Sequence, residues 1–180
     1  SHLAPSNPLP FQALGRFYAS RKEFDTALDM FANALKAQPN FLLAYIDRGD
    51  IFFVKREDDK ALAEYQKALK IAPRFPPAQV KIGMVYQRRE QWAEAEQAYQ
   101  TAIQIDPKQV VAYNNLAWIS AERRTNLDSA LTWAKKANEL APQVATVQDT
   151  LGWVHRARGE LKLAVKVLER AAAIKPEQSQ

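Results

Sequence analysis

The stretch FQALGRFYASRKEFDTALDMFANALKAQP, residues 11–39, decides the fold, because its spacing returns along the whole chain. Its last residue, Pro39, is followed by further prolines at a nearly constant interval of about 34 residues. These are Pro73, Pro107, Pro142 and Pro176, with one extra residue in the interval before Pro142. A constant interval of this size indicates one small structural unit that is copied and stacked. A stacked array presents a surface, so the sequence favours recognition over catalysis.

Small residues keep the same interval. Alanines recur at Ala27, Ala61, Ala95, Ala130 and Ala164, and glycines recur at Gly15, Gly49, Gly83 and Gly152. A glycine inside a helix costs up to about 1 kcal/mol relative to alanine. We therefore expect each glycine to lie where a partner helix comes too close for a Cβ atom, with the recurring alanine facing it.

Each copy contains two segments with helical periodicity. Within 92–103, Trp92, Ala95 and Tyr99 share one face, whereas Glu96 and Gln100 lie on the other. This separation of apolar and polar residues is typical of an amphipathic helix on the outside of a protein. The segment before it, residues 80–87, is apolar on two sides. We predict inner first helices and outer second helices, each second helix ending before its proline.

Read as a whole, the first copy is Phe11-x-x-Leu14-Gly15-x-x-Tyr18, followed by Ala27-x-x-x-Phe31, Ala34 and Pro39. This pattern resembles the tetratricopeptide repeat. Five consecutive repeats are predicted at 8–41, 42–75, 76–109, 110–144 and 145–178, after a leader or tag remnant at 1–7. The resemblance implies an all-α fold, a right-handed superhelical solenoid of about ten antiparallel helices. The 114–118 and 149–153 segments resemble tetratricopeptide proteins of the bacterial cell envelope, including exopolysaccharide-export types.

Composition excludes several classes of function. The 180-residue chain is 47% hydrophobic, has a net charge of +5, and contains no cysteine and only two histidines, His2 and His155. No usual zinc site or nucleophile–base pair can be assembled from these residues, so we predict no catalytic residue, no cofactor and no metal. Cations late in each first helix precede acids that begin the second, which indicates either helix-end electrostatics or a basic ridge. No nucleic-acid motif accompanies them, and no segment is long and apolar enough to span a membrane.

The resemblance also implies where a partner would bind, because the family binds ligands mainly on the inner face of its first helices. The predicted groove is formed by Arg16, Ile46, Asp47, Asp50, Phe53, Lys81, Met84, Arg88, Asn114, Asn115, Trp118, Asp149, Trp153 and Arg156. Phe53, Trp118 and Trp153 either anchor a bound peptide or helix, or pack as core between neighbouring helices. Both interpretations stay open at this point.

The last helix carries an unusual number of apolar residues for the end of an array, where an outer face is normally polar. Leu163 and Val167 occupy the places that Lys60 and Glu64 hold in the second repeat. We expect this surface to meet another repeat, another domain or a second copy of the chain.

The sequence therefore predicts a non-catalytic scaffold that binds a peptide, helix or protein surface, in a bacterial envelope or exopolysaccharide-export assembly. Two alternatives stay open: a self-assembling structural module that uses the C-terminal helix, and a recruiting arm of a larger enzyme. We expect a chain that is periplasmic or cytoplasmic if bacterial. Because Ser1 is not an initiator methionine, we also expect either a processed product or an excised piece of a longer protein.

Overall fold

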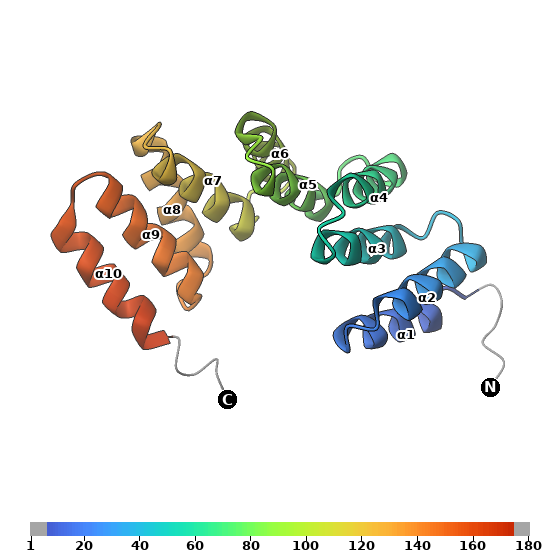
Figure 1. The fold of residues 1–180 in the computed structure, drawn as a ribbon. Helices are drawn as coiled ribbons and strands as arrows, with labels where there is room; N and C mark the ends of the chain where they lie inside the picture. The colour runs from blue at the N-terminus through green and yellow to red at the C-terminus, as the bar shows by residue number, and fades with distance from the viewer. Residues whose placement is uncertain (1–6, 175–180) are drawn as a thin grey trace. The chain divides into compact units, whose positions relative to one another are not determined.

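Helices form where the repeat pattern places them, which confirms the all-α prediction. The computed structural model describes residues 7–174, and in that range it shows ten helices (Figure 1). They are α1 (Leu9–Ser20), α2 (Phe24–Ala37), α3 (Leu42–Val54), α4 (Asp58–Ile71), α5 (Pro76–Arg88), α6 (Trp92–Ile105), α7 (Val110–Glu122), α8 (Leu127–Leu140), α9 (Ala145–Ala157) and α10 (Leu161–Ile174). The predicted leader apart from Asn7, and the end of the fifth repeat beyond Ile174, lie outside the described residues.

The helices fall into two compact units that divide between Glu90 and Gln91. The N-terminal unit contains the helical pairs α1–α2 and α3–α4, with α3 also packed on α2 and α5 packed on α4. The C-terminal unit contains the pairs α7–α8 and α9–α10, with α7 packed on α6 and α9 on α8. Odd-numbered helices are the first helices of the predicted repeats and even-numbered helices are the second.

The core of each unit consists of alanines and a few large side chains. In the N-terminal unit, Phe31 of α2 is buried together with Ala44 and Ile51 of α3. In the C-terminal unit, Ala134 of α8 is buried together with Val154 of α9. The alanines let the helices approach closely, and the few large side chains fill the space that remains between them.

The mid-helix glycines are required for contact between the two helices of a pair. A Cβ atom on Gly15 would lie 2.7 Å from Cδ1 of Phe31, and one on Gly152 would lie 2.7 Å from Cδ2 of Leu168. Separations below 3.0 Å essentially never occur for real Cβ atoms, so the predicted close approach is confirmed at both glycines. The predicted partner was wrong at Gly15, where the nearest side chain is Phe31, one turn beyond Ala27; at Gly152 the carbonyl oxygen of the predicted Ala164 lies 3.5 Å away, behind Leu168. The glycine creates room for a large side chain of the second helix.

One residue in every turn between a first and a second helix has a positive φ. These residues are Lys22 (63°), Arg56 (60°), Glu90 (58°), Arg124 (51°) and Gly159 (79°). Only the last is a glycine, which adopts this left-handed conformation without the steric cost that other residues incur. The turn of the fourth repeat contains the extra residue expected from its longer interval, and Asn126 there is also left-handed, with φ of 48°.

Candidate functional site

The first helices of the N-terminal unit are linked by charged side chains. Arg16 on α1 donates three hydrogen bonds to Asp47 on α3: Nε to Oδ2 at 2.9 Å and to Oδ1 at 3.1 Å, and Nη2 to Oδ1 at 3.0 Å. Gln12 donates to the same carboxylate at 2.7 Å. The hydrogen bond to Asp47 is the main cause that raises the pKa of Arg16. Asp47 is therefore fully occupied by its own chain.

A second charged link lies one repeat further along the same face. Asp50 of α3 accepts hydrogen bonds from Lys81 Nζ at 2.9 Å and from the Tyr65 hydroxyl at 2.7 Å. Burial is the main cause that raises the pKa of Tyr65, and the charge of Asp50 adds to it. Arg16, Asp47 and Asp50 also line a recess of about 210 Å³ whose apolar wall includes Phe24 and Ile51.

Phe53 lies on α3 beneath an arginine of α5. The Arg88 guanidinium carbon is 3.7 Å from the centre of the Phe53 ring, and Nη1 donates to the Phe53 carbonyl at 2.6 Å. Asp58 accepts from Nη2 of the same guanidinium. Burial, followed by the positive charges of Arg56 and Arg89, lowers the pKa of Arg88. This stack is a cation–π contact that holds the aromatic ring in place.

The corresponding face of the C-terminal unit is largely neutral. Asn115 of α7 donates to the Tyr99 hydroxyl at 2.9 Å, and Trp118 is half-buried. Trp153 of α9 packs against the core cluster of this unit, and its indole nitrogen is buried. The Arg156 guanidinium carbon lies 4.6 Å from the Trp153 ring centre. Trp153 therefore packs partly in the core, as one of the two interpretations of the sequence predicts, and Arg156 lies beside its ring.

The remaining predicted residues differ in how accessible they are. Met84, Asn114 and Asp149 are half-buried, as is Lys81. Ile46 is 7% exposed and belongs to the core, so its side chain is not available to a partner in this structure. Val167 is 9% exposed and packs in the core of the C-terminal unit, whereas Leu163 is 48% exposed.

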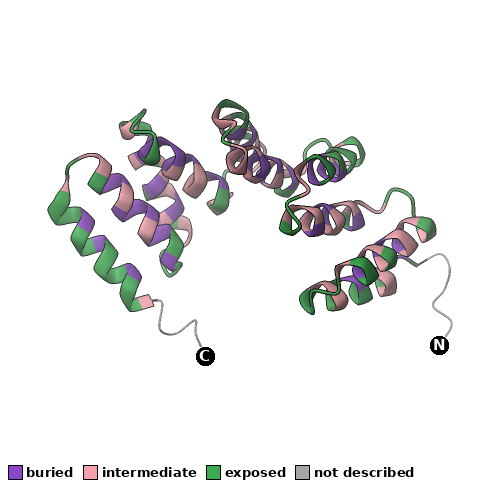
Figure 2. Cartoon of the chain, viewed as in Figure 1, coloured by how far each residue is buried: buried purple, intermediate pink, exposed green. Residues whose placement is uncertain are grey.

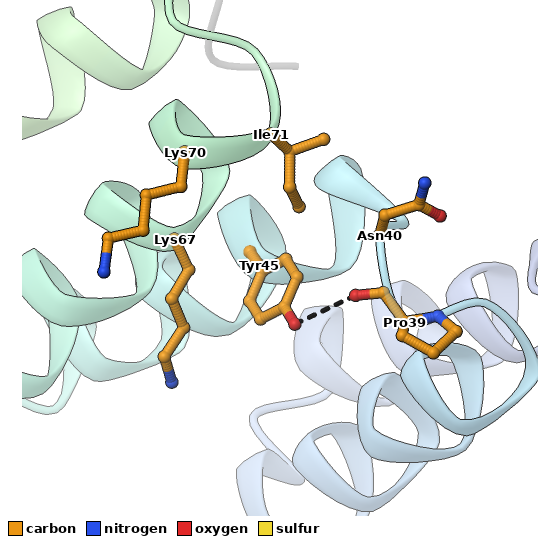
Figure 3. A pocket seen from close by; sticks show the side chains of 6 residues that line it. All are labelled: Pro39, Asn40, Tyr45, Lys67, Lys70 and Ile71. Atoms are coloured by element: carbon orange, nitrogen blue, oxygen red, sulfur yellow. Dashed lines mark hydrogen bonds between the residues drawn. The ribbon is translucent and has the colours of Figure 1, made fainter.

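Two further recesses, each lined by a first helix and at least one second helix, were not predicted from the sequence. The first, of about 400 Å³, is lined by Tyr45 and Ile71 with Lys67 and Lys70, and Tyr45 donates to the Pro39 carbonyl at 3.0 Å (Figure 3). The second, of about 580 Å³, lies in the C-terminal unit and is lined by Ile103, Tyr113, Thr132, Trp133, Lys135, Lys136 and Glu139. Tyr45 and Tyr113 stand two repeats apart, and that spacing was the signal in the sequence.

Comparison with known families decides what kind of chain this is. Residues 13–76 match the model of the tetratricopeptide repeat. Within this span the chain belongs to the tetratricopeptide repeat family. Residues 81–172, about half of the chain, belong in addition to a family described as a domain of unknown function (DUF6340). A search of curated protein sequences found none that matches.

Solved structures show the same tetratricopeptide fold. MamA 41-end from Desulfovibrio magneticus RS-1 is 17% identical, with a TM-score of 0.76 over 96% of this chain and 97% of that chain. YrrB, described as a TPR protein with an unusual peptide-binding site, is 22% identical, with a TM-score of 0.68 over 95% and 88%. PilF of Pseudomonas aeruginosa is 21% identical, with a TM-score of 0.83 over 92% and 75%. At these identities the likeness concerns the fold.

Two further features bear on chemistry. Across residues 7–174, no three His, Asp or Glu side chains are grouped so that they could hold a metal ion. None of the helices in that range combines the length and the apolar character that a membrane crossing requires.

Proposed function

We propose that this chain is a non-catalytic scaffold that binds a peptide, helix or protein surface through the inner face of its first helices. The observation that carries the proposal is the pairing of an aromatic ring with an arginine on that face in each unit. Phe53 lies under Arg88, and Trp153 lies under Arg156. Aromatic residues and arginine are the side chains most enriched at the energetic centres of protein interfaces. A ring already fixed by a cation loses little side-chain entropy when a partner covers it.

The inner faces of the two units differ in charge and therefore favour different partners. Asp47 and Asp50 already have partners within the chain, namely Arg16, Gln12, Lys81 and Tyr65, so these two carboxylates are less available to a ligand. Arg156 is exposed and has Trp153 beside it, so the C-terminal unit combines an apolar surface with a cation. We infer that the C-terminal unit makes the main contact, with a segment that carries an apolar or aromatic residue next to an acidic one.

The test uses peptides selected from a displayed random library on the immobilised chain. Trp153→Ala is expected to weaken binding of a selected peptide by about 30-fold, as truncation of an interface anchor does. Trp92→Ala is the matched control, because Trp92 also has an arginine near its ring, Arg123 at 5.9 Å, but lies on a second helix. Fluorescence anisotropy with labelled peptide measures both. Equal affinity of the two variants, or peptides that compete only for second helices, would refute the inner-face proposal.

The cellular setting is a separate part of the proposal. The 114–118 and 149–153 segments resemble repeats of bacterial envelope proteins, and this likeness alone supports a role in an envelope or exopolysaccharide-export assembly. Recovery of the chain and its bound partners from envelope fractions of its source would support that setting. Recovery with ribosomes or soluble enzymes alone would contradict it.

A further inference from the structure

Within each unit, a first helix covers an apolar stripe on the second helix of the preceding repeat. Phe24 and Leu28 of α2 pack with the cluster that contains Ile51 of α3. Leu131 of α8 packs with the cluster that contains Leu151 and Val154 of α9. This repeated contact is the interface by which one repeat stacks on the next.

The last described helix carries the same stripe without a cover. Leu161, Val165 and Leu168 of the fifth repeat occupy the positions that Phe24, Leu28 and Phe31 hold in the first. Phe31 is 1% exposed, but Leu161, Val165 and Leu168 are 63%, 56% and 37% exposed. Figure 2 shows α10 as largely exposed along its length. We call these three residues the open stripe.

Among the described residues, α1 carries a matching apolar surface that no second helix contacts. Phe17 of α1 corresponds to Ile51, Val85, Ile119 and Val154 on the later first helices. Those four side chains are 3%, 0%, 0% and 0% exposed, whereas Phe17 is 55% exposed. Leu14, one turn earlier, is 38% exposed. We call Leu14 and Phe17 the open cover.

We propose that α1 of a second copy of this chain packs on α10, so that the open cover of one copy closes the open stripe of another. The two surfaces are the two sides of an interface that the chain already forms inside each unit, and this continuity identifies the occupant. The contact joins different surfaces and is therefore heterologous, so that each added copy presents a new open end. This inference concerns the exposed surfaces of α1 and α10 and does not depend on the inner-face proposal.

Ion pairs mark the register of this interface and indicate how strong the contact between copies should be. Asp25 pairs with Lys55 at 3.4 Å, and Asp59 pairs with Arg89 at 2.7 Å, each across the boundary between neighbouring repeats. Asp128 and Arg158 repeat the arrangement in the C-terminal unit. At the open ends the corresponding residues are Lys162 and Arg21. Two cations would thus meet, which makes the association weaker than the internal contacts and dependent on salt.

Sedimentation velocity over a range of chain concentrations tests the proposal. Wild type is expected to shift from monomer to larger species as concentration rises. Phe17→Glu and Val165→Glu should each reduce the association constant by about 100-fold, because each places a charge in the apolar contact. A mixture of the two variants should form dimers and nothing larger, since each keeps one intact surface.

Lys166→Glu is the matched control on the same helix. Lys166 is exposed and corresponds to Asp29 of the first repeat, an exposed acid that lies outside the stripe. This variant should associate as wild type does. Lys162→Asp should tighten association by about threefold, because it recreates the surface ion pair with Arg21.

Three outcomes would overturn the proposal. A wild-type chain that stays monomeric at every concentration means that something other than a second copy covers the stripe. A mixture of Phe17→Glu and Val165→Glu that stays monomeric, while wild type associates, means that the contact is not head to tail. Weaker association of Lys162→Asp means that the register differs from the internal one.

Discussion

The two units use one repeat but fasten their first helices in different ways. In the N-terminal unit, ion pairs join Arg16 to Asp47 and Asp50 to Lys81, in each case between neighbouring first helices. At the corresponding places in the C-terminal unit stand Trp118 and Thr150, which carry no charge. The same backbone spacing therefore accepts either ion pairs or neutral contacts. The choice determines how strongly each face responds to salt, because exposed charges are screened.

The largest expected effect tests whether the units are independent. Leu116 of α7 is fully buried, and Leu116→Ala should cost the C-terminal unit about 3 kcal/mol of its free energy of unfolding. Stacked repeats contact only their neighbours, so the effect should stay within that unit. Amide hydrogen exchange should show lower protection in α7–α9 and unchanged protection in α1–α3. An equal loss of protection in both units would show that they unfold together.

A smaller effect compares the tyrosines of the second helices. Tyr65 donates to the Asp50 carboxylate, and Tyr99 accepts from the neutral amide of Asn115. Hydrogen bonds to charged groups are the stronger kind, so Tyr65→Phe should cost about 2 kcal/mol and Tyr99→Phe about 1 kcal/mol. Urea denaturation measures both. The reverse order would mean that the charged contact contributes no more than the neutral one.

Substitutions in the turns of the two units are expected to change the free energy of unfolding by a similar or smaller amount. Gly159→Ala should cost about 1 kcal/mol, because alanine is strained at a φ of 79°. Arg56→Gly in the N-terminal unit should gain about 0.5 kcal/mol, because it relieves the same strain at a φ of 60°. Thermal unfolding checks both changes. A loss in Arg56→Gly would show that the contacts of the arginine outweigh its backbone strain.

The smallest effect concerns two glutamates that precede second helices at the same repeat position. The pKa of Glu160 is lowered chiefly by its hydrogen bond to His155, whose Nδ1 lies 2.6 Å from Oε2, and then by Arg158. The pKa of Glu57 is lowered chiefly by Lys60. A carboxyl group whose pKa is lowered in the folded state stabilises the fold at pH values above its ordinary pKa of 4.5. This stabilisation is lost as the pH falls through the lowered pKa of the folded state.

His155→Phe should separate these two glutamates. Phenylalanine fits, because Phe52 fills the same position in the second repeat. The pKa of Glu160 should rise toward its ordinary value, and that of Glu57 should stay lowered, as a carboxyl NMR titration would show. An unchanged Glu160 would mean that Arg158 alone accounts for its shift.

The helices could be predicted from the sequence because the period, the small residues and the prolines agree. Even the extra residue of the fourth repeat could be assigned to the correct turn, where Asn126 tolerates a positive φ. The partner of Gly15 could not be predicted, because two residues of α2, Ala27 and Phe31, lie one turn apart on the same side of the helix. Which of these two residues faces Gly15 depends on how far α1 and α2 are shifted along their axes relative to each other.

The predicted groove residues come from transferring positions from one repeat to the next. That procedure identifies corresponding places, but it does not tell whether a side chain reaches the surface. Ile46 was selected in this way and is buried, and Val167, which was selected for the surface of the last helix, is also buried. The ion pairs between repeats, such as Asp25 with Lys55, are visible in the sequence only as charges at helix ends. Their pairing depends on the register between stacked helices, which the sequence of one repeat does not contain.

The left-handed residues of the turns have a practical consequence for labelling. Each turn needs one residue of this conformation, and the fourth turn already contains one residue more than the others without a change in the helices beside it. Exposed turns of this kind are where proteins accept added sequence most readily. An epitope or a dye-binding tetracysteine inserted next to Asn126 would report on the whole protein in cells, while every helix kept its neighbours.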